Sequence, residues 1–265
     1  ERSPDGALRS FLSGGSEFDD NYTAELGADW EHRFSPNFST KLIGLYTSNN
    51  VEQSDVFDTY TAPATFLTRT QLRATNGGER VARLTSTWRV SDDHTLEFGG
   101  EGAFNFRETD LNIFNQPQGG VRVRVPLAVS KARVEEIRGE GFITDVWTVN
   151  DALTLETGLT FEASRITQTG DQSKEREFSY PKPRITATWA VDDSSQLRAS
   201  LQRDIAQLDF AEFSSTVDFI NAASTQGNPD LVPEKAWKAR VEWETRFAQR
   251  GAITLALFHD EVQDV

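Results

Sequence analysis

The chain has 265 residues, a formal net charge of −14 at pH 7, and neither cysteine nor methionine. The lack of cysteine excludes a disulfide framework and a thiolate metal site, and the acidic balance without a Lys/Arg cluster argues against nucleic-acid binding. No run approaches the ~20 apolar residues of a membrane helix, but transmembrane strands escape that test because only every second residue faces lipid.

Alternation of apolar and polar residues predicts extended strands, each with one apolar and one polar face. In residues 22–30 the even positions are apolar and the odd ones polar, and similar runs occupy 96–106, 153–163 and 237–243. These runs last about 10 residues, where ordinary strands average about five or six. A tilted strand needs about 9–11 residues to cross a bilayer, so the runs favour membrane-spanning strands.

We expect about ten strands from this pattern, near residues 21–34, 38–49, 79–90, 94–107, 132–149, 152–167, 178–190, 195–204, 236–247 and 251–262. Some have mixed faces. Ile43 and Leu45 interrupt the second strand, and the fifth carries Asp145 on the face of Ile143 and Trp147. Residues 252–258 are apolar on both faces.

The expected connections alternate in length. Short turns rich in Asp, Asn, Ser, Pro and Gly lie near 35–37, 91–93, 150–152, 192–194 and 248–251. Long polar connections lie near 50–80, 108–131, 168–177 and 204–235, and strand extensions could lie inside them at 66–74 or 121–129. Short turns on one rim and long loops on the other are typical of outer-membrane barrels, with the short turns periplasmic.

Five tryptophans each precede one of the short turns and lie on the more apolar face of their strand, Trp147 least cleanly: Trp30, Trp88, Trp147, Trp189 and Trp243. Tryptophan combines an apolar ring with one N–H donor and favours the boundary between lipid and water. We therefore expect a membrane-interface girdle at the short-turn rim, with these five side chains facing outward.

One segment resembles a known family. Residues 226–237 contain Asn228, Pro229, Leu231, Pro233 and Glu234 in an Asn-Pro-x-Leu-x-Pro-Glu pattern. This pattern is similar to one in TonB-dependent outer-membrane receptors, where it leads from an extracellular loop into a descending strand. The resemblance is specific over 178–265 and is one of pattern upstream. It implies a closed barrel of about 22 strands around a plug, and uptake driven by a periplasmic TonB-type energy-coupling protein that acts through the plug.

We therefore expect residues 1–265 to form a single all-β segment of an antiparallel up-and-down transmembrane barrel in the outer membrane of a Gram-negative bacterium. The chain begins with neither a translation start nor a signal peptide and stops inside an expected strand. We accordingly expect a piece of a longer protein, with the plug and the terminal strands outside it.

The expected function is a receptor, not an enzyme, that contacts outer-membrane lipid and binds and actively imports a ligand: a siderophore, a cobalamin-like cofactor or a glycan. No cofactor is expected. A passive porin-type outer-membrane barrel is one alternative. A soluble extracellular β-sandwich or carbohydrate-binding module is another, and it would pack its apolar faces against each other.

The sequence leaves the ligand and its contacts open. Candidate contacts are the aromatic loop residues Tyr60, Phe114, Phe210, Phe213 and Phe219. They could stack on a sugar or siderophore, or form a small satellite core under a long loop, which is commoner.

Other chemistry has little support. His32, His94 and His259 lie on different strands, so we expect no metal site, and no Gly-x-Ser-x-Gly motif supports catalysis. The polar faces carry Glu97, Glu101, Glu156, Glu162, Glu242, Glu244, Arg107, Arg184, Arg198 and Arg240. These charges could steer a ligand, but barrel interiors are polar by default, which favours ordinary paired charges.

Overall fold

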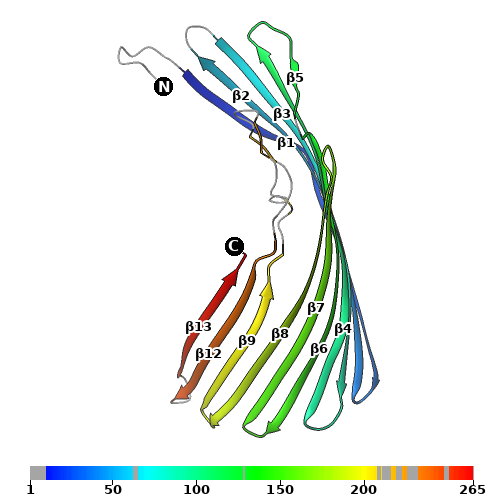
Figure 1. Ribbon diagram of the computed structural model, residues 1–265, viewed down its shortest axis with the longest axis vertical. Coiled ribbons are helices and arrows are strands. Elements are labelled where there is room, and N and C mark those ends of the chain that lie inside the picture. Colours follow the sequence, from blue (N-terminus) through cyan, green and yellow to red (C-terminus); the bar gives the residue numbers. More distant parts are fainter. Residues whose placement is uncertain are drawn as a thin grey trace.

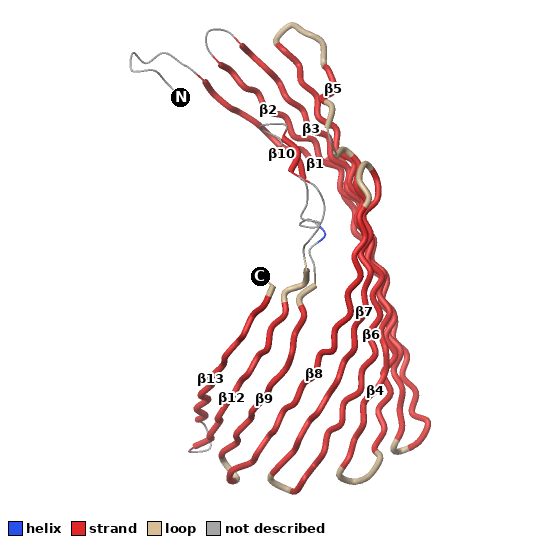
Figure 2. The backbone as a smooth tube through the Cα atoms, in the orientation of Figure 1, coloured by secondary structure: helices blue, strands red, loops and turns tan. Residues whose placement is uncertain are grey.

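The computed structural model describes residues 10–61, 65–127, 129–207, 210, 216–218, 223–225, 232–247 and 251–264. Strands make up most of this chain (Figure 2). They are β1 (Ser10–Ser35), β2 (Phe38–Thr61), β3 (Thr65–Arg89), β4 (His94–Pro117), β5 (Val123–Val125), β6 (Lys131–Asn150), β7 (Leu153–Gly170), β8 (Lys174–Asp192), β9 (Ser195–Ile205), β10 (Thr216–Asp218), β11 (Ala223–Thr225), β12 (Lys235–Phe247) and β13 (Gly251–Gln263). Within these described ranges no helix is both long and apolar enough to cross a membrane.

One antiparallel sheet contains all the long strands. Its order is β1-β2-β3-β4-β6-β7-β8-β9-β12-β13, while β5 pairs with β4 and β10 pairs with β11 in a separate ribbon. Each long strand thus pairs with the next long strand along the chain, which confirms the all-β, up-and-down architecture. Figure 1 shows the sheet curved into an open trough. Among the described residues β1 pairs only with β2 and β13 only with β12, so the sheet is not closed.

The two faces of the sheet differ in chemistry. Phe178 of β8 and Phe210 pack against Val134 and Ile166, on the concave side of the trough. Residues on the opposite, convex face are mostly apolar and remain exposed: the exposed fractions of Ile143, Leu159 and Phe161, for example, are 49%, 48% and 53%. No second sheet covers that face in the part of the chain that the structure describes. A β-sandwich would have buried it, so that alternative is wrong.

Several strands continue beyond the expected limits. β2 and β3 pair without interruption from Phe38↔Trp88 to Thr61↔Thr65, so the long connection predicted at 50–80 is wrong. Likewise β4 runs to Pro117, and β7 and β8 leave only a short turn in place of the predicted connection at 168–177. Near these ends apolar and polar residues no longer alternate regularly between the faces, while backbone hydrogen bonding continues the ladder.

One glycine and two prolines affect how neighbouring strands of the sheet pair. A Cβ on Gly78 would lie 2.5 Å from the Thr47 carbonyl oxygen, so glycine there permits the close approach of β2 to β3 rather than a turn. Pro181 and Pro183 lie inside β8, and the β8–β9 ladder extends only to Arg184↔Gln202. Because proline has no N–H to donate, the ladder with β9 stops just below the two prolines.

An aspartate fastens two connections at the rim opposite the short turns. The Asp171 carboxylate, after β7, accepts hydrogen bonds from the Ser130 and Lys131 backbone N–H groups at 2.6 and 2.9 Å, and from the Ser130 hydroxyl at 2.9 Å. These donors stabilise the charged carboxylate and lower the pKa of Asp171. The start of β6 is thereby tied to the β7–β8 turn.

The Asp171 tether gives a pH-dependent prediction. Folding lowers the pKa of Asp171. The stabilisation from the tether is therefore fully present above the ordinary pKa of an aspartate, about 4, and it is lost as the pH falls through the lowered pKa of the folded state. Asp171→Asn is expected to reduce the hydrogen-exchange protection of the Ser130 and Lys131 amides at pH 7.

The matched control is Asp192→Asn, which removes the negative charge of a similar carboxylate that accepts the Ser194 N–H in a short turn at the other rim. It should leave the two amides protected. Unchanged protection in Asp171→Asn would contradict the tether.

Candidate functional site

A row of three glutamates crosses the concave face. Glu101 of β4 lies opposite Glu140 of β6, and Glu140 lies opposite Glu162 of β7. Side chains of neighbouring strands that share a register row lie close together, so these carboxylates are forced into one group. All three are largely buried, at 14% to 15% exposure.

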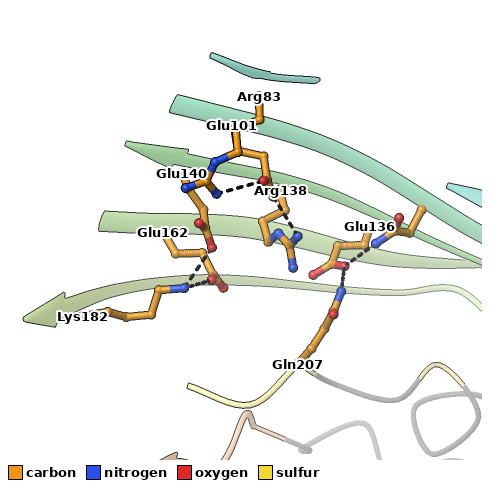
Figure 3. Close-up of polar contacts among 9 residues, drawn as sticks. Arg83, Glu101, Glu136, Arg138, Glu140, Glu162, Lys182 and Gln207 are labelled. Carbon is orange, nitrogen blue, oxygen red and sulfur yellow. Dashed lines mark hydrogen bonds and ion pairs between the residues drawn. The ribbon is translucent and has the colours of Figure 1, made fainter. Parts of the chain in front are cut away.

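Three cations neutralise the glutamate row (Figure 3). Arg83 and Arg138 each bind Glu101 at 3.2 Å. Lys182 of β8 bridges Glu140 at 2.9 Å and Glu162 at 2.6 Å. A buried charge that loses its partner is strongly destabilising, so the network fixes neighbouring strands to one another more than it offers free charge to a ligand.

Only part of this network is predicted from the sequence. Glu101 and Glu162 were among the polar-face carboxylates, whereas Glu140, Arg138 and Lys182 were missed. Arg138 and Glu140 lie in the strand whose faces Asp145 had made ambiguous, and the register between strands cannot be read from alternation. Other expected charges are paired too: Glu156 with Arg184, Glu242 with Arg240 and Glu244 with Arg246.

The connection that follows β9 contacts the inner wall. Gln207 donates a hydrogen bond from Nε2 to Glu136 at 3.1 Å, and Asn105 donates to the same carboxylate oxygen at 3.2 Å (Figure 3). Glu136 is only 3% exposed. Together with Phe210 on Val134 and Ile166, these bonds seat Gln207 and Phe210 against β4, β6 and β7.

A cavity of about 660 Å³ adjoins this contact. Its lining comes from β2, β3, β4 and the connection after β9: Asn49, Val51, Gln53, Arg73, Thr75, Gly77, Gly78, Glu79, Asn105, Phe106, Arg107, Gln207 and Phe210. Two of these residues, Arg73 and Arg107, have no carboxylate partner among the described residues. The Asn105 Oδ1 atom is buried without a hydrogen-bond partner in the same part of the chain.

The cavity lining has a definite chemical preference. Two unpaired guanidinium groups and several amide side chains outweigh the carboxylate of Glu79. Guanidinium groups bind carboxylate and phosphate oxygens in a two-pronged geometry. The cavity can therefore hold an anionic, oxygen-rich molecule, with the Phe210 ring available for stacking.

The predicted aromatic contact residues lie in different parts of the structure. Phe210 contributes to both the satellite core and the cavity. Phe114 lies under the Arg122 guanidinium at 4.1 Å, and Tyr60 contacts Phe66 across the β2–β3 pair with ring centroids 6.4 Å apart. Phe213 and Phe219 lie outside the described residues. Of the three described candidates, the structure thus places Phe210 alone in the cavity.

The five girdle tryptophans are all exposed on the convex face, from 37% for Trp243 to 52% for Trp30. Trp189 and Trp243 flank Leu197 in one register row. The girdle role itself stays a prediction.

Asp145 also lies on the convex face. The His94 Nδ1 atom lies 2.9 Å from its carboxylate, and the His94 ring stacks on Trp147 with centroids 5.5 Å apart. This pairing explains how an acidic residue is accommodated on the face of Ile143 and Trp147.

Two residues of the family motif and the predicted residue His32 lie in described parts of the chain. Pro233 is buried just before β12, and the Glu234 carbonyl accepts the Ala206 N–H at 2.9 Å. Asn228, Pro229 and Leu231 lie outside the described residues. His32 lies between the rings of Trp30 and Phe34. No group of three His, Asp or Glu side chains is arranged for a metal ion in the described part of the chain.

Comparison with solved structures places the fold. A copper transporter, OprC, matches with a TM-score of 0.63 and 12% identity, over 97% of this chain and 50% of that one. The ferric preacinetobactin receptor BauA from Acinetobacter baumannii matches with a TM-score of 0.55 and 11% identity, over 90% and 37%. The haemophore receptor HasR from Serratia marcescens gives 0.54 and 12%, over 96% and 50%. The chain thus spans half or less of the length of these proteins.

Among curated protein sequences, none matches this chain significantly. The family model described as "TonB dependent receptor-like, beta-barrel" matches residues 2–265. That match covers nearly the whole chain and agrees with the sheet topology. The chain therefore belongs to the TonB-dependent receptor-like β-barrel family.

Proposed function

We propose that this chain forms part of the wall of an outer-membrane receptor that binds a ligand and imports it actively, with a plug and a TonB-type partner supplying the drive. Residues 1–265 would form a single barrel segment, and the convex face would contact lipid. The observation that carries the proposal is the division of the ten long strands of one continuous sheet into an exposed apolar face and a polar face with paired charges. Barrels that enclose a wet interior in a membrane need this division.

The proposed chemistry is recognition and transport rather than catalysis. The family and its structural neighbours are transporters or receptors. By their names, these neighbours handle copper, ferric preacinetobactin and a haemophore with haem. The cavity favours, for this chain, an anionic oxygen-rich ligand such as a carboxylate-bearing or phenolate-bearing metal chelate. Arg73 and Arg107 would bind its oxygens, and Phe210 would pack on its apolar part.

The membrane setting is tested on a convex-face residue. Leu159 lies midway along β7, opposite Ile143, and is 48% exposed. In a bilayer, Leu159→Arg is expected to destabilise the full-length protein by ~2–4 kcal/mol, the cost of an arginine on a lipid-facing site near the midplane. The measurement is the guanidinium-induced unfolding midpoint in lipid vesicles, read by heat-modifiable gel mobility.

Thr160→Arg is the matched control, because Thr160 is the next residue of β7 and faces the concave side. It should change the midpoint much less. Equal effects of the two variants, or a stable Leu159→Arg protein that does not sediment with membranes, would overturn the membrane setting.

The ligand class is tested with three probes: ferric citrate as an anionic chelate, cyanocobalamin, and maltohexaose as a neutral glycan. We expect the full-length receptor to bind ferric citrate best. Arg107→Gln should weaken that binding about tenfold or more, since a hydrogen bond to a charged group contributes ~1.5–3 kcal/mol. Calorimetry measures the affinity.

The control for this variant is Arg246→Gln, which changes a concave-face arginine that is already paired with Glu244 at the short-turn end of β12. Its affinity should match that of the unaltered receptor. Preferential binding of a neutral probe, unaffected by Arg107→Gln, would contradict the assignment.

Active import is tested in cells. Uptake of radiolabelled ferric citrate through the full-length receptor should require the TonB-type coupling partner, while surface binding should not. Deletion of that partner is expected to abolish uptake and leave binding intact. Undiminished uptake in the deletion strain would instead indicate a passive porin-type barrel.

A further inference from the structure

Arg80 is a cation on the convex face that contacts aromatic rings and no carboxylate in the described part of the chain. It lies in β3, opposite Tyr46 of β2 and Phe104 of β4. Its guanidinium carbon is 5.7 Å from the Tyr46 ring centroid and 5.8 Å from that of Phe104. Aromatic rings at such distances attract a cation but leave its charge in place. No carboxylate in the described part of the chain lies within ion-pair distance of Arg80.

The position of Arg80 corresponds to one edge of the apolar band. Along β3, the convex-face residues between Arg80 and Trp88 include Ala82 and Leu84, whereas Asn76 lies on the other side of Arg80. Trp88 is eight positions away, about 26 Å along the strand at ~3.3 Å per residue. Counted inclusively, Arg80 to Trp88 are nine residues, which is the lower end of the ~9–11 residues that a tilted strand needs to cross a bilayer, so Arg80 lies where lipid tails give way to head groups.

Two other convex-face arginines on nearby strands are neutralised. Arg133 binds Glu108 at 3.0 Å and Glu135 at 2.6 Å. Arg165 binds Glu177 at 3.1 Å and shares a register row with Arg80, through Phe104 and Ile137. Arg80 is therefore left as a cation that the protein positions without supplying its anion.

A row of small side chains runs across the convex face next to Arg80, on the side of the apolar band. Its members are opposite one another on six strands: Ala28, Gly44, Ala82, Gly102, Gly139 and Ala163. A Cβ added at Gly102 or Gly139 would meet nothing within 4 Å, so close backbone approach does not require glycine at either site. At Gly139 and Ala163 the row borders a hollow of about 620 Å³. The row supplies space for a hydrocarbon chain beside the cation.

We propose that Arg80 binds the phosphate of an anionic membrane lipid, with an acyl chain of that lipid lying over the row of small residues. Charge complementarity selects the head group, because Arg80 is a positioned cation without a protein anion at the level of lipid phosphates. Tyr46 and Phe104 flank the guanidinium group, and Arg80 is exposed at the surface of the protein. This inference depends on the membrane setting of the proposed function.

The test uses the full-length receptor in neutral detergent, titrated with phosphatidylglycerol and followed by native mass spectrometry. Arg80→Gln is expected to raise the dissociation constant about fivefold, the change that corresponds to ~1 kcal/mol for one basic residue at a membrane surface. Arg80→Lys should retain part of the affinity. Arg133→Gln is the matched control, since it removes a convex-face arginine that is already paired with Glu108 and Glu135, and its dissociation constant should change less than twofold.

Two further probes identify the source of the phosphate. Phosphatidylcholine, which has no net charge, and glycerol phosphate, which has no acyl chains, should both bind more weakly than phosphatidylglycerol. Equal affinities of Arg80→Gln and the unaltered receptor would overturn the inference, and so would tight binding of glycerol phosphate alone. If the receptor enters membranes but Arg80→Gln leaves the dissociation constant for phosphatidylglycerol unchanged, only the lipid site is refuted. If the receptor fails to enter membranes in the Leu159 experiment, the proposed function is refuted.

Discussion

Antiparallel register is the constraint on which the rest of this structure depends. Because side chains alternate along a strand, fixing one residue opposite another assigns every residue of both strands to a face. A slip by one position would place the Glu140 side chain on the convex face and the Ile143 side chain on the concave face. The hydrogen-bond ladder from β1 to β13 therefore determines at once the apolar surface, the glutamate row and the cavity. Each short turn fixes the register of one strand pair.

Charge pairing on the concave face reinforces that register. Lys182 contacts glutamates from two other strands, and Arg83 and Arg138 reach Glu101 from both sides. A wet interior tolerates single charges, but side chains as buried as these require partners. The wall thus neutralises many of its own charges, and beside the cavity Arg73 and Arg107 are exceptions, without a carboxylate partner among the described residues. These exceptions, rather than the total charge of the chain, carry the information about a ligand.

Alternation predicted the fold class and the strand order because the central part of each strand has one apolar and one polar environment. It underestimated β2, β3 and β4, where apolar and polar residues stop alternating regularly near the rim while the ladder continues. The glutamate row could be predicted only in part, since Glu140 and Glu162 meet through pairing of β6 with β7. The cavity could not be predicted at all. It brings Arg73, Arg107 and Gln207 together from β3, β4 and the connection after β9, and no local spacing relates them.

The two prolines of β8 shape the opening of the trough. Above Arg184 the ladder with β9 stops, and β9, β12 and β13 have 11, 13 and 13 residues, whereas β1 to β4 have 24 to 26. Among the described strands the sheet is taller from β1 to β4 than at β9 and β12. Arg73 and Arg107 lie on the taller part, on the side of the glutamate row away from the short turns. Two missing N–H donors in one strand thus set the level at which the ladder between β8 and β9 ends.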